Sequence, residues 1–170
     1  IDIDPSSIGK IVKIDLALVS DVDVFLLALI KRFKEKNKNF IDVNKENITK
    51  WWKQINKWRE KKSLNYKTSD TIIKPQYAVE KLYELTKNQD TFITTEVGQH
   101  QMWAAQYYKF NKPNRWMTSG GLGTMGFGLP AAIGVQIANP GKLVVDIAGE
   151  ASVLMTMQEI STAVQYKLPI

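Results

Sequence analysis

The sequence predicts an α/β fold in which helices flank a parallel sheet. From residue 75 onward, segments with helical spacing alternate with short strand-like runs, the order typical of strand–helix–strand units. Two of those runs, TFITTEVG at 91–98 and LVVDIAG at 143–149, are almost wholly apolar or β-branched apart from their ends. Strands covered by helices on both faces have this composition.

The first 74 residues predict fewer regular elements. Residues 1–4 resemble the end of a strand, and the turn DPSSIG follows. Residues 21–36 predict a helix with Asp21 near its N-cap and lysines at its C-terminal end, where the helix dipole favours them. Residues 37–74 form a basic linker containing an amphipathic helix, whose apolar face we expect to pack on a core. That face consists of Ile48, Trp51, Trp52, Ile55 and Trp58, at three- and four-residue steps.

The remaining residues predict the main domain, 75–170. A helix with proline in its first turn covers 75–89, and the strand at 91–98 leads into a helix over 99–110. A loop with a short strand covers 111–119, and the glycine-rich stretch from 120 becomes helical before 142. The strand at 143–149 precedes one long helix over 151–167. We place the domain boundary within 62–74.

Composition bounds the class of protein. The 170 residues are 44% hydrophobic and 24% charged, which is ordinary for a globular protein. The absence of cysteine excludes disulfides, thiolate metal sites and a cysteine nucleophile. The net charge of +6 is local, because residues 31–67 carry 13 Lys/Arg against 4 Asp/Glu. The rest is close to neutral, so a nucleic-acid partner is not expected. No apolar run approaches the ~18 residues needed to span a bilayer, so a membrane partner is not expected either. Both ends fall inside predicted elements, which predicts a fragment of a longer chain.

The glycine-rich stretch contains a possible dinucleotide fingerprint. Gly121, Gly123 and Gly126 spell G-x-G-x-x-G, and Asp146 lies 20 residues farther on. The fingerprint requires a solid strand that runs into the first glycine, but NKPNRWMTSG offers only a few strand-like residues after a proline. Close helix packing is the alternative role for these glycines. Nicotinamide binding is therefore not favoured.

Two polar residues follow the predicted strands. His100 is the single histidine and cannot build a multi-histidine metal site, but it lies just past a strand, where open α/β sheets bind ligands. Glu150 lies in the turn after the second strand. Its carboxylate and the following serine suit Mg²⁺, but an acid there also stabilises the first turn of a helix. Composition leaves both roles of Glu150 open.

Longer motifs carry a resemblance to a known family. EVGQHQMWAAQYYKFNKPNRWMTSGGLGTMGFGLPAAIG, followed by VVDIAGEAS, resembles the catalytic subunit of the thiamine-diphosphate-dependent acetohydroxyacid synthases (acetolactate synthases). The resemblance covers residues 75–170, and IDIDPSSIG and SDV resemble the end of the same family's Rossmann-like central domain. It implies that 1–36 end a central FAD-associated domain and that 75–170 begin the thiamine-diphosphate-binding domain.

The resemblance also implies site residues. Glu150 falls where the family binds Mg²⁺, and Met125 falls where a bulky side chain supports the bent cofactor. No catalytic residue is expected here, because the activating glutamate of the family lies in an N-terminal domain. The residues expected at thiamine diphosphate are Val97, Gly98, Gln99, His100, Gly123, Met125, Gly149, Ala151 and Ser152. Those expected at FAD, which performs no net redox chemistry in the family, are Asp2, Ile3, Asp21 and Val22.

The implied reaction is the decarboxylation of pyruvate and transfer of the hydroxyethyl unit to pyruvate or 2-oxobutyrate, in valine, leucine and isoleucine biosynthesis. A homodimer or tetramer with a separate regulatory subunit is expected, in the bacterial cytoplasm, with a plastid left open. The fragment alone is expected to be inactive. The alternatives are another thiamine-diphosphate carboligase or decarboxylase, such as glyoxylate carboligase, and a non-catalytic homologue. Glu150 and Ala151 depart from the Gly-Asp-Gly-Ser turn of the family.

Overall fold

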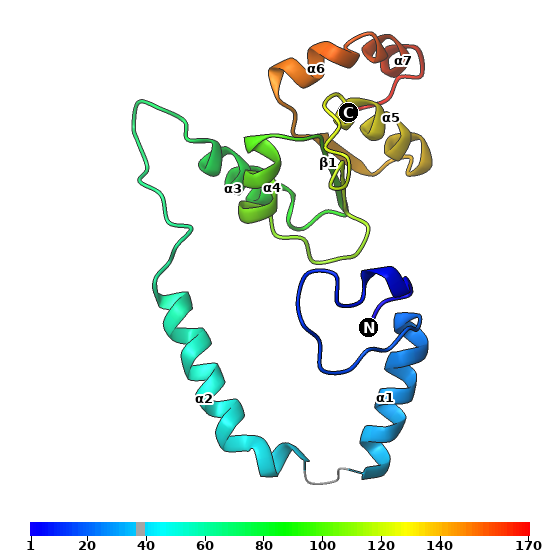
Figure 1. Ribbon diagram of the computed structural model, residues 1–170. Coiled ribbons are helices and arrows are strands. Elements are labelled where there is room, and N and C mark those ends of the chain that lie inside the picture. Colours follow the sequence, from blue (N-terminus) through cyan, green and yellow to red (C-terminus); the bar gives the residue numbers. More distant parts are fainter. Residues whose placement is uncertain (37–39) are drawn as a thin grey trace. The chain divides into compact units, whose positions relative to one another are not determined.

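The computed structural model describes residues 1–36 and 40–170, which divide into two compact units. Unit 1 is Ile1–Ser63 and unit 2 is Leu64–Ile170. Each is described by itself below (Figure 1). None of the helices in these described ranges combines the length and hydrophobicity that crossing a bilayer requires.

Unit 1 contains a short N-terminal loop structure and two helices. Asp4 caps the 3₁₀ helix η1 (Pro5–Ser7), because its Oδ1 accepts a hydrogen bond of 2.8 Å from the amide of Ser6. The expected strand end at 1–4 is reduced to one parallel bridge between Asp2 and Val19. Helix α1 (Val22–Lys36) confirms the predicted helix, and α2 (Phe40–Glu60) contains the tryptophan-bearing segment.

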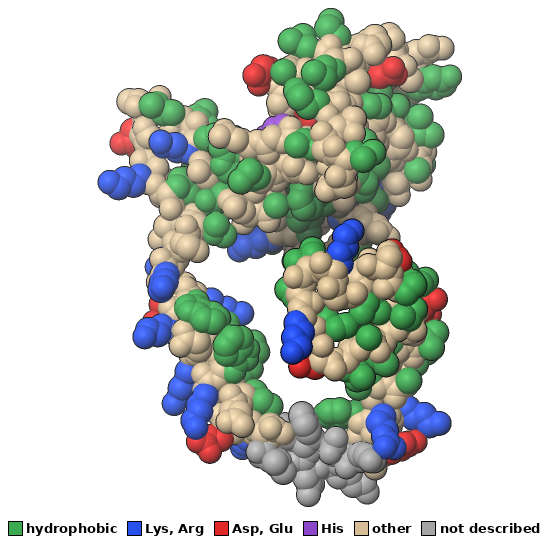
Figure 2. Space-filling view, viewed as in Figure 1, with side chains coloured by type: hydrophobic (Ala, Val, Ile, Leu, Met, Phe, Trp, Pro, Cys, Tyr) green, Lys and Arg blue, Asp and Glu red, His purple; other side chains and the backbone are tan. Residues whose placement is uncertain are grey.

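The apolar stripe of α2 differs from our expectation. Trp51, Trp52 and Trp58 expose 56%, 50% and 49% of their surface, so the prediction that this face packs on a core is wrong for the described part of the chain. The rings of Trp51 and Trp58 instead contact each other edge to face at 5.4 Å. Figure 2 shows Lys and Arg side chains along one side of α2 and hydrophobic side chains along another. Amphipathic spacing specifies which residues share a face but not what covers that face.

Unit 2 is built around a parallel sheet with strand order β2-β1-β3, which confirms the predicted fold class. Its strands are β1 (Thr91–Thr95), β2 (Trp116–Thr118) and β3 (Leu143–Asp146). Its helices are α3 (Pro75–Thr86), α4 (Gln99–Tyr107), α5 (Gly128–Ala138), α6 (Glu150–Thr156) and α7 (Glu159–Gln165).

Alternation along the central strand creates two core layers. Ile93 points to one face of the sheet, where it packs with Val79 of α3 and with Tyr108 after α4. Phe92 points to the opposite face, where it packs with Val144 of β3 and Ala132 of α5. Figure 1 shows α3 and α4 on one side of β1 and α5 on the other. Burial on both faces explains why the strands read as continuous apolar runs.

The predicted long helix over 151–167 is divided into α6 and α7. Between them, the amides of Ile160 and Ser161 bond to the carbonyls of Met157 and Gln158, at 3.0 and 3.1 Å. These bonds span three residues rather than four, so a tighter turn interrupts the α-helical ladder. The backbone stays right-handed there, and helical periodicity alone does not reveal the break.

Candidate functional site

The carboxyl ends of the three strands meet at one edge of the sheet in unit 2. Each strand is followed by a turn, and the turns cover residues 96–98, 119–127 and 147–149. In open parallel sheets this edge is where ligands bind. Every residue that we expected at thiamine diphosphate or Mg²⁺ lies in these turns or in the first turn of the helix that follows.

His100 joins the first and third turns. A methyl group added to Gly98 would lie 2.9 Å from Cε1 of His100, and one added to Gly149 would lie 3.2 Å from the same atom. The imidazole ring therefore packs against the backbone of both glycines. Gly98 also has φ +146°, a conformation that favours glycine, so this turn has two reasons to lack a side chain.

Glu96 is a buried acid that our sequence reasoning did not select. It directly follows β1, is 1% exposed, and its Oε1 accepts a hydrogen bond of 3.0 Å from the amide of Gly149. The same oxygen lies 3.6 Å from Nε2 of His100. Among the residues that the structure describes, neither Nε2 of His100 nor Oε2 of Glu96 has a hydrogen-bond partner. A carboxylate at the end of an otherwise apolar strand is the signal that could have identified it.

Asp146 is a second acid at this edge, at the end of β3. Thr94, its neighbour in β1, donates a hydrogen bond of 2.8 Å to its Oδ1. Burial raises the pKa of Asp146 to about 6, the Thr94 hydroxyl opposes that shift, and the negative charge of Glu96 adds to it. A side chain at Gly128 would meet Oε2 of Glu96 at 2.3 Å and Oδ1 of Asp146 at 2.4 Å. Both carboxyl groups therefore depend on a glycine at position 128.

The glycine-rich turn passes close to the other two turns. Gly123 lies near Val97, because a Cβ at position 123 would be 3.8 Å from its side chain. Gly126, with φ +79°, packs against α6, where the hydroxyl of Thr156 donates to the Gly126 carbonyl at 3.2 Å. Met125 is 43% exposed. The turn thus lies beside the edge that also holds His100 and Gly149.

The elements around the possible dinucleotide fingerprint differ from those that such a fingerprint requires. The strand before the glycines is only Trp116–Thr118, and α5 begins at Gly128, after the last glycine of the motif. Asp146 faces Thr94 and Gly128. This arrangement, like the sequence, does not favour a nicotinamide site.

Glu150 occupies the first position of α6 and is exposed. Ala151 lies in the same helix and has no positive φ, so its Cβ causes no backbone strain. Ser152 is 2% exposed and lies under the glycine-rich turn, where its carbonyl would be 3.5 Å from a Cβ at Gly126. Over residues 1–35 and 44–170, no three His, Asp or Glu side chains are grouped as metal ligands. The geometry at Glu150 accommodates either of the roles that composition left open.

The residues expected at FAD lie together in unit 1. The amide of Asp2 donates to the carbonyl of Leu18, and the amide of Ser20 donates to the carbonyl of Asp2, both at 3.2 Å. These bonds bring Asp2 and Ile3 beside the segment that leads into Asp21 and Val22, at the start of α1. All four are exposed.

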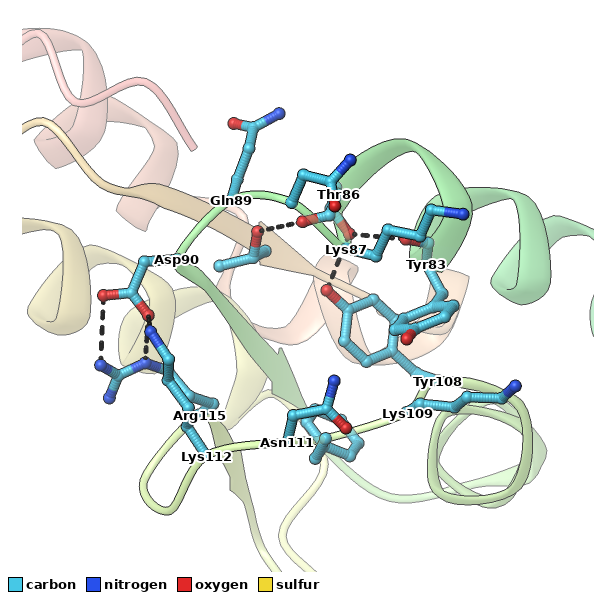
Figure 3. Close-up of a pocket in the computed structure, with 13 residues that line it drawn as sticks. Tyr83, Thr86, Lys87, Gln89, Asp90, Tyr108, Lys109, Asn111, Lys112 and Arg115 are labelled. Atoms are coloured by element: carbon cyan, nitrogen blue, oxygen red, sulfur yellow. Dashed lines mark hydrogen bonds and ion pairs between the residues drawn. The ribbon is translucent and has the colours of Figure 1, made fainter.

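A pocket of about 420 Å³ lies at the opposite, amino-terminal edge of the sheet in unit 2 (Figure 3). Arg115 binds Asp90 through Nε at 2.8 Å and Lys112 binds it at 3.2 Å, and together they hold the pKa of Asp90 well below its ordinary range. The hydroxyls of Thr86 and Tyr108 pair at 2.8 Å. None of the residues expected at a cofactor lines this pocket, so it is distinct from the edge described above.

Comparison with known proteins finds similarity over the part of the chain that contains the carboxyl edge. Residues 96–170 match the family described as the thiamine pyrophosphate enzyme, C-terminal TPP binding domain. The whole chain aligns with the acetolactate synthase isozyme 3 large subunit of Escherichia coli strain K12, at 48% identity over 29% of that protein. It is 42% identical to the acetolactate synthase large subunit of Haemophilus influenzae, over 29% of its length. Acetolactate synthase 1, chloroplastic, of Nicotiana tabacum is 44% identical over 25% of its length. The chain thus spans less than a third of each of these relatives.

Proposed function

We infer that this chain, whose residues 96–170 belong to the thiamine pyrophosphate enzyme C-terminal domain family, is part of an acetolactate synthase catalytic subunit. Similarity along the whole chain to acetolactate synthase large subunits supports the reaction class. The structural observation that carries the proposal is the meeting of two separate turns at the His100 ring. The first and third strands contribute these turns, and both contain residues that we expected at the diphosphate.

The carboxyl edge fits a diphosphate group. Gly98 and Gly149 leave the backbone bare on both sides of His100, where a Cβ would collide with the ring. Helices α4 and α6 begin at this edge, and helix N-termini present free amides that favour anions. Nε2 of His100 is buried and has no hydrogen-bond partner within the described ranges, as expected where a polar ligand is to bind. We propose that Val97, Gly98, Gln99 and His100 bind one side of the diphosphate and that Gly149, Ala151 and Ser152 bind the other.

We propose that Glu150 ligates the Mg²⁺ that accompanies the diphosphate. Its carboxylate is exposed at the edge, and Mg²⁺ commonly takes one or two protein carboxylates and completes its shell with phosphate oxygens and water. Asp2, Ile3, Asp21 and Val22 would contact FAD, since backbone hydrogen bonds bring the two segments together.

Thiamine diphosphate supplies the carbanion chemistry by which a 2-oxoacid loses carbon dioxide and its remaining carbon unit is transferred. This chain contributes binding and orientation. Gly123 and Met125 lie in the turn that passes Val97, and we propose that they border the reactive rings of the cofactor. Because Met125 is 43% exposed and not packed in the core, its side chain is available to support a bound group.

The proposed substrates are pyruvate as donor and pyruvate or 2-oxobutyrate as acceptor. The proposed assembly is a homodimer or tetramer with a regulatory subunit, in a bacterial cytoplasm or a plastid. Glyoxylate carboligase is not favoured as an alternative, because the relatives reported above are acetolactate synthases.

The test uses the full-length protein that contains this chain. Purified protein with pyruvate, thiamine diphosphate, Mg²⁺ and FAD should form acetolactate, and omission of thiamine diphosphate should abolish the product. A folded protein that forms no acetolactate from pyruvate would contradict the proposal. Formation of tartronate semialdehyde from glyoxylate in its place would identify the alternative carboligase.

A further inference from the structure

Glu96 is held at a cost to stability. A buried carboxylate loses its hydration and needs several hydrogen bonds to compensate, but Glu96 accepts one, from the amide of Gly149 at 3.0 Å. Its Oε2 has no hydrogen-bond partner in the described part of the chain and faces the same point above Gly128 as Oδ1 of Asp146. Two acids that share a buried position repel each other when both are charged. Such a residue is more readily explained by a role in the site than by packing.

The contacts of Glu96 reach both halves of the cofactor edge. Glu96 directly precedes the turn with Val97 and Gly98, and it binds Gly149 across 53 positions of sequence. The same Oε1 lies 3.6 Å from Nε2 of His100, whose side chain is 15% exposed. One carboxylate oxygen therefore contacts the backbone of the third turn and faces the ring that separates the two turns.

We propose that Glu96 is a positioning residue that, by accepting the amide of Gly149 and facing His100, sets the spacing between the two turns that receive the diphosphate. This inference rests on the proposed function for the identity of the ligand. The contacts themselves belong to the protein before any ligand binds. The role requires a hydrogen-bond acceptor at Oε1, and it requires Gly128, because a side chain there would displace the carboxyl group.

The experiment compares variants in the full-length protein by two measurements. Hydrogen–deuterium exchange of the peptide that covers 147–153, without cofactor, reports the Gly149 turn. Calorimetric titration of thiamine diphosphate with Mg²⁺ reports binding. Glu96→Ala should speed exchange in 147–153 and weaken binding by about tenfold or more, as for loss of one hydrogen bond to a charged group. Glu96→Gln keeps an acceptor for the Gly149 amide, so exchange and affinity should remain within about threefold of the unmodified protein.

Gly128→Ala provides a second, independent perturbation. It should give the same faster exchange in 147–153 and the same weaker binding as Glu96→Ala, because its methyl group would displace Oε2 of Glu96. If both act through Glu96, the double variant should be no worse than the more affected single variant. Asp90→Asn is the matched control, since Asp90 lies at the other end of the same strand and binds Arg115. It should change neither exchange in 147–153 nor affinity.

Unchanged exchange and affinity in Glu96→Ala would overturn the proposal. Losses of protection and affinity in Glu96→Gln as large as those in Glu96→Ala would also overturn it, and so would equally large losses in Asp90→Asn. If the unmodified protein does not bind thiamine diphosphate, the proposed function fails, but the exchange of 147–153 still decides whether Glu96 holds the turn. Should Glu96→Ala not fold, Glu96→Gln and Gly128→Ala decide the result, because a variant that keeps the acceptor is then compared with one that displaces it.

Discussion

The carboxylate of Glu96 accepts a hydrogen bond of 3.0 Å from the amide of Gly149, and this bond joins the turn after β1 to the turn after β3. The imidazole of His100 packs against the Gly149 backbone beside it. Residues that are distant in sequence thus form one edge of the sheet.

Alanine at the two glycines beside His100 should have unequal effects. Gly98→Ala places a methyl group 2.9 Å from the ring and forces a residue with a side chain into φ +146°, so we expect a loss of about 1–3 kcal/mol in unfolding free energy. Gly149 has φ −86°, and its methyl group would lie 3.2 Å from the ring, so Gly149→Ala should cost less. Urea unfolding of both variants checks the order. A larger loss for Gly149→Ala would contradict the geometry.

Asp146→Asn should stabilise the protein near neutral pH. Because the pKa of Asp146 is raised to about 6 from 3.8, the folded protein binds a proton there that the unfolded chain has released. The contribution of this protonated group to the free energy of unfolding is therefore fully present below about pH 4. It decreases as the pH rises to about 6 and does not change further above that. Asparagine removes the dependence and still accepts from Thr94. Melting temperatures from pH 4 to 8, without cofactor, should show an advantage of the variant that grows with pH and then levels off.

Asp90→Asn should show the opposite dependence on pH. Arg115 holds the pKa of Asp90 below 3.8, so its contribution is present above that pH and is lost as the pH falls further. The melting temperature of the variant should lie below that of the unmodified protein at pH 7 and approach it as the pH falls below 4. Glu84→Gln is a suitable comparison, since Glu84 pairs with Lys81 at 2.7 Å on the exposed surface of α3. A deficit for Asp90→Asn that persists unchanged in acid would count against the ion pair.

Met125→Ala should affect function rather than stability. Met125 is 43% exposed, so its truncation should alter the free energy of unfolding by less than about 1 kcal/mol. If it supports the bound cofactor, acetolactate formation by the full-length protein should fall by about tenfold or more, with the fold retained. Leu122→Ala, in the same turn at 96% exposure, is the control and should change neither. An equal loss of acetolactate formation in the two variants would contradict the proposed role of Met125.

Glu150→Asp tests the metal ligand. Aspartate is one methylene shorter, and Mg²⁺ requires near-ideal geometry, so the substitution should change the Mg²⁺ concentration that supports half-maximal binding of thiamine diphosphate by about threefold or more. Glu150→Gln, which lacks the charge, should raise it further. If all three proteins have the same Mg²⁺ requirement, Glu150 is a helix-start acid and not a ligand.

Much of unit 2 could be predicted from local pattern. The runs at 91–98 and 143–149 predicted two strands, which the structure has at Thr91–Thr95 and Leu143–Asp146, because both faces of a parallel strand are buried. Pro75 marked the start of α3, because proline suits a first helical turn. The glycine and histidine motifs located the carboxyl-edge turns. Strands, helix starts and turns depend mainly on residues that are close in sequence, so the sequence pattern predicts them.

Tertiary structure alone decided which side chains meet at that edge. The position of Glu96 after a strand can be read from the sequence, but its partner Gly149 lies 53 positions away, and Gly128 is required only because Glu96 and Asp146 both approach it. The exposure of the α2 tryptophans and the break between α6 and α7 were also not predicted. The sequence by itself determined the strands, helices and glycine turns. The joining of two turns by a buried carboxylate follows only from chain folding, because that contact depends on separation in space and not along the chain.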